Sequence, residues 1–363
     1  MQDTTSMNSL RYYLFIIRLA YIFRKKTMIY CQGIGPLNSY KSRQMVKSVL
    51  NNCQIITVRD EDSAKLLDQI GVEKEVIVLS DPAFALSFLD FDKSEMAGKV
   101  DALLSQSNSK VSKISSGSTG EGRVLSSQTN SEASKIGSTG EGRVLSSQTN
   151  SEATKFPDGT AENEKKPLLL VTIRQWGDDS HIVKIAGYLD ELHNRGWNVL
   201  MVPAHYPQDM EAIEKVSEQM SKRPLCINES LSAASFYILT TLVDAVFSMR
   251  LHGLICSFIA DTPAIALSYD PKVDAFMKQT GSEAYCMSAE SFDIATAIKM
   301  LDEVACRTQK TLDEVAGLTP KTLDENTTPT PKTKEQQNRI RVQLTRSAKR
   351  AAEIARELLT GAD

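Results

Sequence analysis

Short apolar runs alternate with stretches whose apolar residues recur every three or four positions, in two separate parts of the chain. The first part has apolar runs at 27–31, 54–58 and 76–79, each closed by turn-forming or polar residues, as in buried strands. The stretches around them predict helices over 8–25, 39–51 and 61–70. This alternation of strands and helices predicts a parallel α/β domain.

The second part begins at Pro167 and has the same alternation. It predicts strands over 168–173, 199–202, 244–248 and 264–267, and helices over 182–195, 208–220, 234–242 and 254–260. This set of elements is sufficient for a complete doubly wound domain. The predicted fold class is therefore α/β, with two Rossmann-like domains.

Between these parts, a segment rich in Ser, Thr, Gly, Glu and Lys extends over residues 93–166. The 17 letters GSTGEGRVLSSQTNSEA occur in it twice, from Gly117 and again from Gly137. Such a composition buries too little apolar surface to offset the entropy lost on ordering. Two copies are also too few for a solenoid. We expect a disordered insertion between the domains.

An 11-residue period follows the second domain, with copies that start at Leu301, Leu312 and Leu323. This period is compatible with a right-handed coiled coil, but the prolines of the later copies would break a helix. We expect a flexible linker. The predicted organisation is an N-terminal domain over 1–92, an insertion over 93–166, a C-terminal domain over 167–300, a linker over 301–333 and a helix over 334–360.

Composition excludes several classes of protein. The net charge of −3 lacks the basic excess of a nucleic-acid-binding protein. The six cysteines include no Cys-x-x-Cys pair, so no metal site is expected and a reducing cytoplasm is the simplest location. The apolar run over 12–17 is too short to span a membrane. An amphipathic helix over 8–25 is expected, with peripheral contact to the inner face of the membrane as an alternative.

Charged side chains follow several predicted strands, at the edge where ligands bind in open parallel sheets. They are Arg59, Arg174, Arg250, His252 and Lys272. Helix N-termini add backbone N–H groups that favour anions. We therefore expect a ligand that carries phosphate or carboxylate, bound beside Arg59, Arg174, Arg250 and Lys272.

Each of these residues also has a structural interpretation. Arg59 could pair locally with Asp60, whereas Arg250 and His252 lie between an apolar strand and an apolar helix, where a charge needs a partner. Gly253 permits close backbone approach there. His205 and Tyr269 also follow strands and are candidates for the acceptor side, while His181 and His193 are expected at surface or helix positions. No nucleotide-binding glycine motif and no Ser-His-Asp order are present.

Five stretches together carry a family resemblance. They are MIYCQGIGPL at 28–37, ITVRDEDSAKLLDQIGV at 56–72, SDPAFAL at 80–86, VTIRQW at 171–176 and SMRLHGLICSFIADTPAIALSYDPKVDAFMKQTG at 248–281. The chain resembles the polysaccharide pyruvyl transferase family, and most closely the type that modifies secondary cell-wall polymers for anchoring S-layer proteins.

The resemblance implies a glycosyltransferase-B-like architecture and a transferase that needs no cofactor. It implies phosphoenolpyruvate as the donor and a hexose of a glycan or lipid-linked saccharide, such as N-acetylmannosamine, as the acceptor of a 4,6-linked pyruvate ketal. By similarity, Arg59, Arg250, Leu251 and His252 fall on donor-binding and catalytic positions. Histidine suits general acid–base catalysis near neutral pH, and arginine suits bidentate capture of phosphate and carboxylate.

Family members begin with a strand and a Gly-rich turn before the segment that resembles Met1, Gln2 and Asp3. The resemblance thus implies an incomplete N-terminal domain whose sheet exposes an unpaired edge. Two alternatives stay open. One is a sugar-nucleotide glycosyltransferase of the same architecture, and the other is an inactive fragment that acts as a binding protein.

Overall fold

The computed structural model describes residues 1–3, 7–115, 166–315 and 333–360. Met1–Leu103 and Lys166–Asp363 form one compact unit, which contains two sheets. Leu104–Lys165 form the second unit, of which the structure describes only the end of one helix. All the contacts considered below lie within the first unit.

The smaller sheet has three parallel strands in the order β1 (Met28–Gln32), β2 (Ile55–Val58) and β3 (Val76–Val78). The helices α1 (Met7–Ile22), α2 (Tyr40–Leu50) and α3 (Glu61–Gln69) precede or connect these strands. Their apolar stripes enclose a core with Leu14, Val46, Ile56 and Leu67. The N-terminus of α3 is capped by Asp60, which accepts a hydrogen bond from the Ser63 N–H at 2.8 Å. This cap fixes the turn that carries Arg59.

The larger sheet has six parallel strands in the order β6-β5-β4-β7-β8-β9. They are β4 (Leu168–Thr172), β5 (Asn198–Met201), β6 (Leu225–Cys226), β7 (Ala245–Ser248), β8 (Ala264–Ser268) and β9 (Cys286–Ser288). Every residue of β4 is buried, as expected for a central strand of a parallel sheet. The chain moves outward from β4 first through β5 and β6, and then in the other direction through β7, β8 and β9. The order of the strands therefore reverses between β4 and β7, where open sheets of this kind bind ligands.

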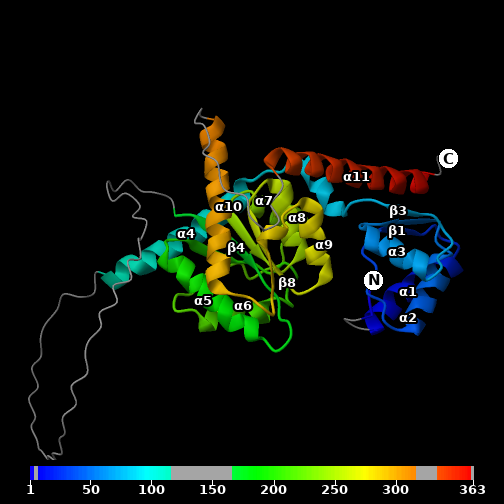
Figure 1. Ribbon diagram of the computed structural model, residues 1–363, viewed down its shortest axis with the longest axis horizontal. Helices are drawn as coiled ribbons and strands as arrows, with labels where there is room; N and C mark the ends of the chain where they lie inside the picture. The colour runs from blue at the N-terminus through cyan, green and yellow to red at the C-terminus, as the bar shows by residue number, and fades with distance from the viewer. Residues whose placement is uncertain (4–6, 116–165, 316–332, 361–363) are drawn as a thin grey trace, which may run out of the picture. The chain divides into compact units, whose positions relative to one another are not determined.

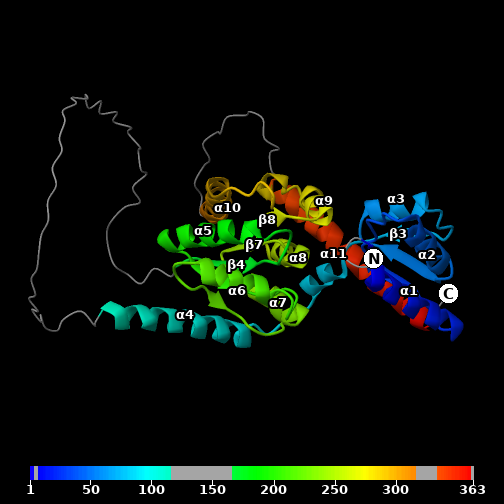
Figure 2. The same ribbon diagram turned by 90° about the horizontal axis from the view of Figure 1, so that it is seen from below.

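Helices cover both faces of the larger sheet (Figures 1 and 2). One face packs on α5 (Ser180–Asn194), α6 (Met210–Gln219) and α10 (Ile294–Val315). The other packs on α8 (Leu251–Ala260) and α9 (Pro271–Thr280), with α7 (Ala233–Thr240) in contact with α8. Alternate residues of β8 face the two cores, with Ile265 and Leu267 in the first and Ala266 in the second.

A short helix, η1 (Pro82–Phe88), follows β3 and packs on α8 through Phe84, whose side chain is buried with Leu254 and Phe276. The C-terminal helix α11 (Lys334–Thr360) agrees with the helix predicted over 334–360. Ser80 donates its hydroxyl to the Leu344 carbonyl of α11, and its N–H donates to Ser347 Oγ at 3.0 Å. These bonds fix the chain just before Asp81.

Two predictions of irregular structure were wrong in part. A helix, α4 (Ser94–Ser115), occupies the start of the segment predicted as disordered over 93–166, because Met96 and Val100 bury apolar side chains there. Likewise, α10 extends through the first 11-residue copy, because Leu301 and Val304 are buried. The duplicated 17-letter segment and residues 316–332 lie outside the described residues.

The strands and helices predicted from the sequence are present, with small shifts at their ends. The prediction omitted β6, β9, α9, η1 and the single-turn η2 (Glu283–Tyr285), all of them short or with a weak apolar pattern. The fold class, α/β with two parallel sheets, is confirmed. Within the described residues, no helix is long and apolar enough to cross a membrane.

Candidate active site

The turn after β7 is held by a pair of buried hydroxyl groups. Thr172 at the end of β4 and Ser248 at the end of β7 place their side-chain oxygens 2.6 Å apart. Ser248 Oγ also accepts the Arg250 N–H at 3.0 Å and donates to the Arg250 carbonyl at 2.7 Å. A Cβ on Gly253 would lie 2.5 Å from Ser248 Oγ. The close approach expected for Gly253 is thus confirmed, and it lets α8 begin directly against the strand ends.

Arg250 pairs with a buried carboxylate that the sequence did not point to. Its Nε donates to Asp209 Oδ2 at 3.1 Å, and its Nη2 donates to Asp209 Oδ1. The Asp209 side chain has no exposed surface, whereas that of Arg250 is 18% exposed. The His205 N–H donates to the same carboxylate at 2.9 Å. This pair gives Arg250 the partner that a buried charge needs, while 18% of the Arg250 side chain stays exposed.

Arg59 extends from the end of β2 across the glycine loop that follows β1. Its Nη1 lies 2.9 Å from Asp81 Oδ2, and its Nε lies 3.6 Å from Asp60. A Cβ on Gly33 would lie 2.8 Å from both Nε and Nη2 of Arg59, so a larger residue there would require the guanidinium to move. Arg59 therefore has both the local partner considered for it and a second one, 22 residues further along the chain.

Asp81 joins three elements at this point. Its Oδ1 accepts the Ala83 N–H at 3.0 Å, which caps η1, and its Oδ2 contacts Arg59. The same Oδ2 lies 3.9 Å from His252 Nε2 in the first turn of α8. That distance is too long for a hydrogen bond but short for a charge interaction. Asp81 thus brings two predicted site residues, Arg59 and His252, to one carboxylate.

His252 is open to solvent at its edge, with 65% of its side chain exposed, yet protein surrounds it on the other sides. Loss of bulk water lowers the pKa of His252 below its usual value. The positive charges of Arg59, Lys272 and Arg250 lower this pKa further, and the negative charge of Asp81 opposes them. The environment therefore favours neutral imidazole, which can accept a proton.

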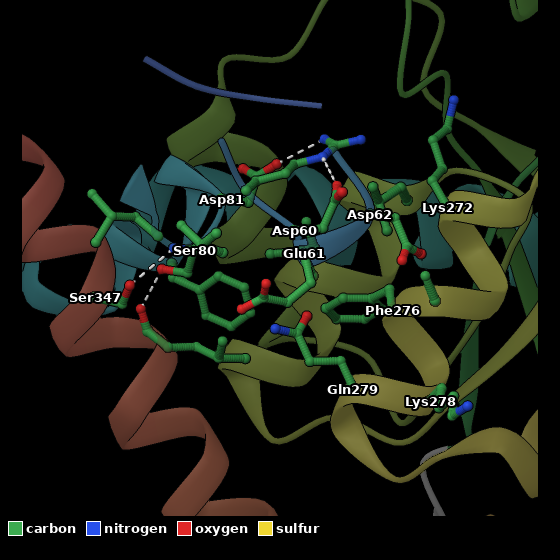
Figure 3. Close-up of a pocket in the computed structure, with 18 of the residues that line it drawn as sticks. Asp60, Glu61, Asp62, Ser80, Asp81, Lys272, Phe276, Lys278, Gln279 and Ser347 are labelled. Atoms are coloured by element: carbon green, nitrogen blue, oxygen red, sulfur yellow. Dashed lines mark hydrogen bonds and ion pairs between the residues drawn. The ribbon is translucent and has the colours of Figure 1, made fainter. Parts of the chain in front are cut away.

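A cavity of about 600 Å³ lies beside these residues (Figure 3). Its walls come from the α3 N-terminus, the chain before η1, and the helices α8, α9 and α11. Its lining holds three cations, Arg59, Lys272 and Lys278, and apolar surface from Leu251, Ile255 and Phe276. It also holds the carboxylates of Asp60, Glu61, Asp62 and Asp81, and it includes neither Arg250 nor His252. Lys272 is held by Asp270, with Nζ 2.9 Å from Oδ2. Leu251 is 7% exposed and contributes to the apolar wall.

A second group of predicted residues lies at the ends of β4 and β8. Arg174 Nη1 donates to the Tyr269 hydroxyl at 3.0 Å, and its guanidinium lies 4.8 Å from the centroid of that ring. Lys272 Nζ lies 5.9 Å from the same centroid. Trp176 also packs against this group, 6.3 Å from Tyr269 between ring centroids. Tyr269 thereby links the donor-side residues Arg174 and Lys272.

The three other histidines of the sequence lie in different environments. The His205 side chain is exposed, while its backbone N–H contacts Asp209. His193 lies near the end of α5, as expected for a helix position. His181 also takes a helix position, in the first turn of α5, where it is buried and 1% exposed. Its Nε2 lies 3.2 Å from the Arg174 carbonyl, where it supports the loop of the second group.

Among the described residues, no three His, Cys, Asp or Glu side chains are grouped so that they could hold a metal ion. The residues of the site that the sequence did not single out are Asp81, Asp209, Thr172 and Ser248. Asp81 follows a strand and precedes a proline, which is a signal for a cap. Asp209 carries no such signal, because it lies inside a predicted helix with an ordinary polar pattern.

A family model described as polysaccharide pyruvyl transferase matches residues 1–139. The matched part includes β1 to β3, η1, Arg59 and Asp81. The match covers less than half of the chain, and the stretch at 248–281 lies outside it. No curated protein matches the chain.

Several solved structures are similar to the chain at low identity. A putative UDP-N-acetylglucosamine 2-epimerase from Listeria monocytogenes has 10% identity and a TM-score of 0.49, over 96% of this chain and 72% of that one. The UDP-GlcNAc 2-epimerase from Neisseria meningitidis has 12% identity and a TM-score of 0.45, over 95% and 72%. Heptosyltransferase II from E. coli has 12% identity and a TM-score of 0.33, over 40% of this chain and 49% of that one. The chain thus spans about half the length of that transferase, and likenesses at these scores carry no argument about reaction or substrate.

Proposed function

Because residues 1–139 match the polysaccharide pyruvyl transferase family, we propose that the chain transfers pyruvate from phosphoenolpyruvate to a hexose, forming a pyruvate ketal. The acceptor is a saccharide of a cell-envelope polysaccharide or its lipid-linked precursor. The resemblance to enzymes that modify secondary cell-wall polymers favours N-acetylmannosamine and a role in S-layer anchoring. This reaction belongs in the cytoplasm, at the inner face of the plasma membrane.

The observation that carries the proposal is the position of Asp81 between Arg59 and His252. One carboxylate holds a cation 2.9 Å away on one side and faces a histidine 3.9 Å away on the other. Arg59 belongs to the part that matches the family, and His252 to the stretch that resembles it. Reaction of an enol phosphate donor needs cations that bind its anionic groups and a neighbouring acid–base group that transfers protons.

The donor carries two anionic groups, a phosphate and a carboxylate. Arg59 and Lys272 line one cavity and offer cations to these groups, while Leu251 and Phe276 give an apolar wall for the carbons of the donor. Arg250 adds a guanidinium whose orientation is fixed by Asp209. Arginine forms charge-assisted hydrogen bonds with carboxylates and phosphates, so Arg59 and Arg250 suit the two anionic groups of the donor.

His252 acts as the acid–base group. In the first step, the oxygen of one sugar hydroxyl bonds to C2 of the donor, and neutral His252 carries the proton of that hydroxyl to C3. In the second step, the oxygen of the other hydroxyl bonds to C2, the bond from C2 to the phosphate oxygen breaks, and the second proton leaves with the phosphate. The lowered pKa of His252 leaves the ring neutral at the start, as proton transfer from the hydroxyl requires.

The acceptor lies on the side of Tyr269 and His205 in this proposal. Tyr269 is positioned by Arg174, and its hydroxyl accepts a hydrogen bond from Arg174 Nη1. His205 exposes its ring while its backbone holds Asp209. In this arrangement Lys272 would lie between the saccharide and the donor, because its ammonium lies near the Tyr269 ring.

The proposal is tested with phosphoenolpyruvate and an N-acetylmannosamine glycoside that has free 4- and 6-hydroxyl groups. Phosphate release together with an acid-labile ketal on the glycoside, detected by mass spectrometry, is the expected result. Release of a nucleotide from a UDP-sugar, without phosphate release from phosphoenolpyruvate, would instead indicate a glycosyltransferase. No turnover of either donor by folded protein would favour the inactive fragment.

A further inference from the structure

The helix α1 (dark blue in Figure 2) has an apolar face on each side. Leu10 and Leu14 are buried against the first sheet, as in any helix of a parallel α/β domain. However, of the fifteen large hydrophobic side chains that are exposed in the described residues, eight lie between Tyr12 and Phe23. The helix therefore differs from the expected amphipathic pattern, because its outer face is apolar as well as its buried face.

The exposed side chains form a second helical stripe. Tyr12, Phe15, Ile16, Leu19 and Ile22 follow one another at spacings of three, one, three and three, so they share one face. Their exposed fractions range from 39% at Leu19 to 65% at Ile22. An exposed patch of this kind marks an interaction surface in a folded protein.

The charges of the chain segment that carries the stripe are all of one sign. Arg11 and Arg18 lie within α1, and Arg24, Lys25 and Lys26 follow its end. No acidic residue occurs from residue 7 to residue 26. Lys26 donates to the Leu358 carbonyl at 2.8 Å, but Arg11, Arg18, Arg24 and Lys25 are exposed. The partner of this surface should therefore be apolar within and negatively charged outside.

We propose that the outer face of α1 binds an anionic lipid surface. Phenylalanine and tyrosine rings favour the boundary between head groups and acyl chains, and arginines beside an apolar stripe reach anionic head groups. Each basic residue near such a surface contributes to binding, and the contribution falls within a Debye length. A second copy of the chain fits less well, because two such surfaces would place basic residues against basic residues.

The inference does not depend on the reaction proposed above. It adds the surface by which the chain would meet a membrane, and its test needs neither donor nor acceptor. Loss of lipid binding would leave the transfer of pyruvate to a soluble glycoside unaffected, so the two proposals fail separately.

The test is co-sedimentation of the full chain with vesicles of phosphatidylcholine that contain either no phosphatidylglycerol or about one third of it. Binding to the anionic vesicles that weakens with salt is the expected result. Phe15→Ser with Ile22→Ser should weaken binding at least tenfold, because both side chains are more than 60% exposed and their replacement leaves the core intact. Arg18→Glu should weaken it about five-fold or more, since it removes one favourable charge and adds a repulsive one.

Val183→Ser is the matched control, because Val183 is 63% exposed on α5 and belongs to the other sheet. It should bind as the original chain does. Absence of binding to anionic vesicles would overturn the proposal, as would binding that the double substitution leaves unchanged. A dimer seen by sedimentation equilibrium that Phe15→Ser with Ile22→Ser dissociates, without vesicle binding, would assign the face to a second copy and would also overturn it.

Discussion

Asp209 holds the guanidinium of Arg250 through two of its nitrogens, Nε at 3.1 Å and Nη2. The two residues belong to different loops, because Asp209 directly precedes α6 and Arg250 follows β7. A fully buried carboxylate beside a guanidinium that keeps 18% of its surface exposed fixes the direction in which the arginine points. The pair therefore links the stability of the larger domain to the geometry of the proposed donor site.

Replacement of Asp209 by Ala should lower the free energy of unfolding by about 3–5 kcal/mol, because it leaves the Arg250 charge without its partner in a buried place. The Asp209→Asn variant keeps the shape and loses the charge, and should retain part of the stability. Urea denaturation monitored by circular dichroism measures both changes. Donor affinity should fall in both variants, since Arg250 is no longer oriented.

Asp62→Ala provides the control for this measurement. Its carboxylate is 81% exposed and pairs with Lys65 at 3.6 Å within one helix, so its loss should change stability by about 0.5 kcal/mol or less. A loss of stability in Asp209→Ala no larger than that in Asp62→Ala would contradict the structural role of the buried pair.

His252→Ala should abolish pyruvyl transfer and leave donor binding measurable, because the cations that hold the anion stay in place. Its side chain is 65% exposed, so the substitution should not lower the melting temperature noticeably. Arg59→Ala should do the opposite and weaken donor binding, since one charge-assisted hydrogen bond contributes about 1.5–3 kcal/mol. Calorimetric titration with phosphoenolpyruvate and a phosphate-release assay separate the two effects. Near-normal turnover by folded His252→Ala protein would remove His252 from the mechanism.

Much of this site could be predicted because parallel sheets collect strand ends at one edge. Arg59, Arg174, His252 and Lys272 are recognisable from their place after apolar runs, without any knowledge of the pairing of strands. Partners that lie far apart in the sequence cannot be found in this way. Asp81 and Arg59 are 22 residues apart, and Asp209 and Arg250 are 41 residues apart. Which carboxylate meets which cation depends on the order of the strands and on the direction of each side chain.

The errors in the fold have a similar origin. Residues 94–115 are rich in Ser and Lys, so a composition argument predicts disorder, yet two buried side chains, Met96 and Val100, anchor the helix. The first 11-residue copy resembles its proline-containing successors, although Leu301 is fully buried in the core of the larger domain. A repeat in the sequence does not require that all its copies share one structure, because tertiary packing acts on each copy separately.

The pH dependence of the rate tests the charges around His252. In the proposed reaction neutral His252 accepts a proton, so the rate falls as the pH drops through the pKa of that ring. Asp81 raises this pKa and Lys272 lowers it. Asp81→Asn should therefore shift the acid limb of kcat/KM to lower pH, and Lys272→Met should shift it to higher pH. Shifts of both variants in the same direction would show that another group controls this limb.

Gly253 and Gly98 allow a matched test of the packing at the start of α8. A Cβ on Gly253 would lie 2.5 Å from Ser248 Oγ and 3.0 Å from Thr172 Oγ1, both of which are buried. Gly253→Ala should therefore displace the hydroxyl pair that holds the Arg250 backbone and lower the free energy of unfolding by about 1–3 kcal/mol. Gly98 lies in α4, where an added Cβ would meet no atom within 4 Å, so Gly98→Ala should raise it by about 0.5–1 kcal/mol through helix propensity.

The same comparison extends to activity. A shift of the Arg250 turn moves a group that we propose binds the donor, so Gly253→Ala should raise KM for phosphoenolpyruvate, whereas Gly98→Ala should leave it unchanged. If Gly253→Ala instead proved as stable and as active as Gly98→Ala, α8 could not begin as close to the strand ends as the structure has it. The contact between the Ser248 hydroxyl and the Arg250 backbone would then not determine where the guanidinium lies.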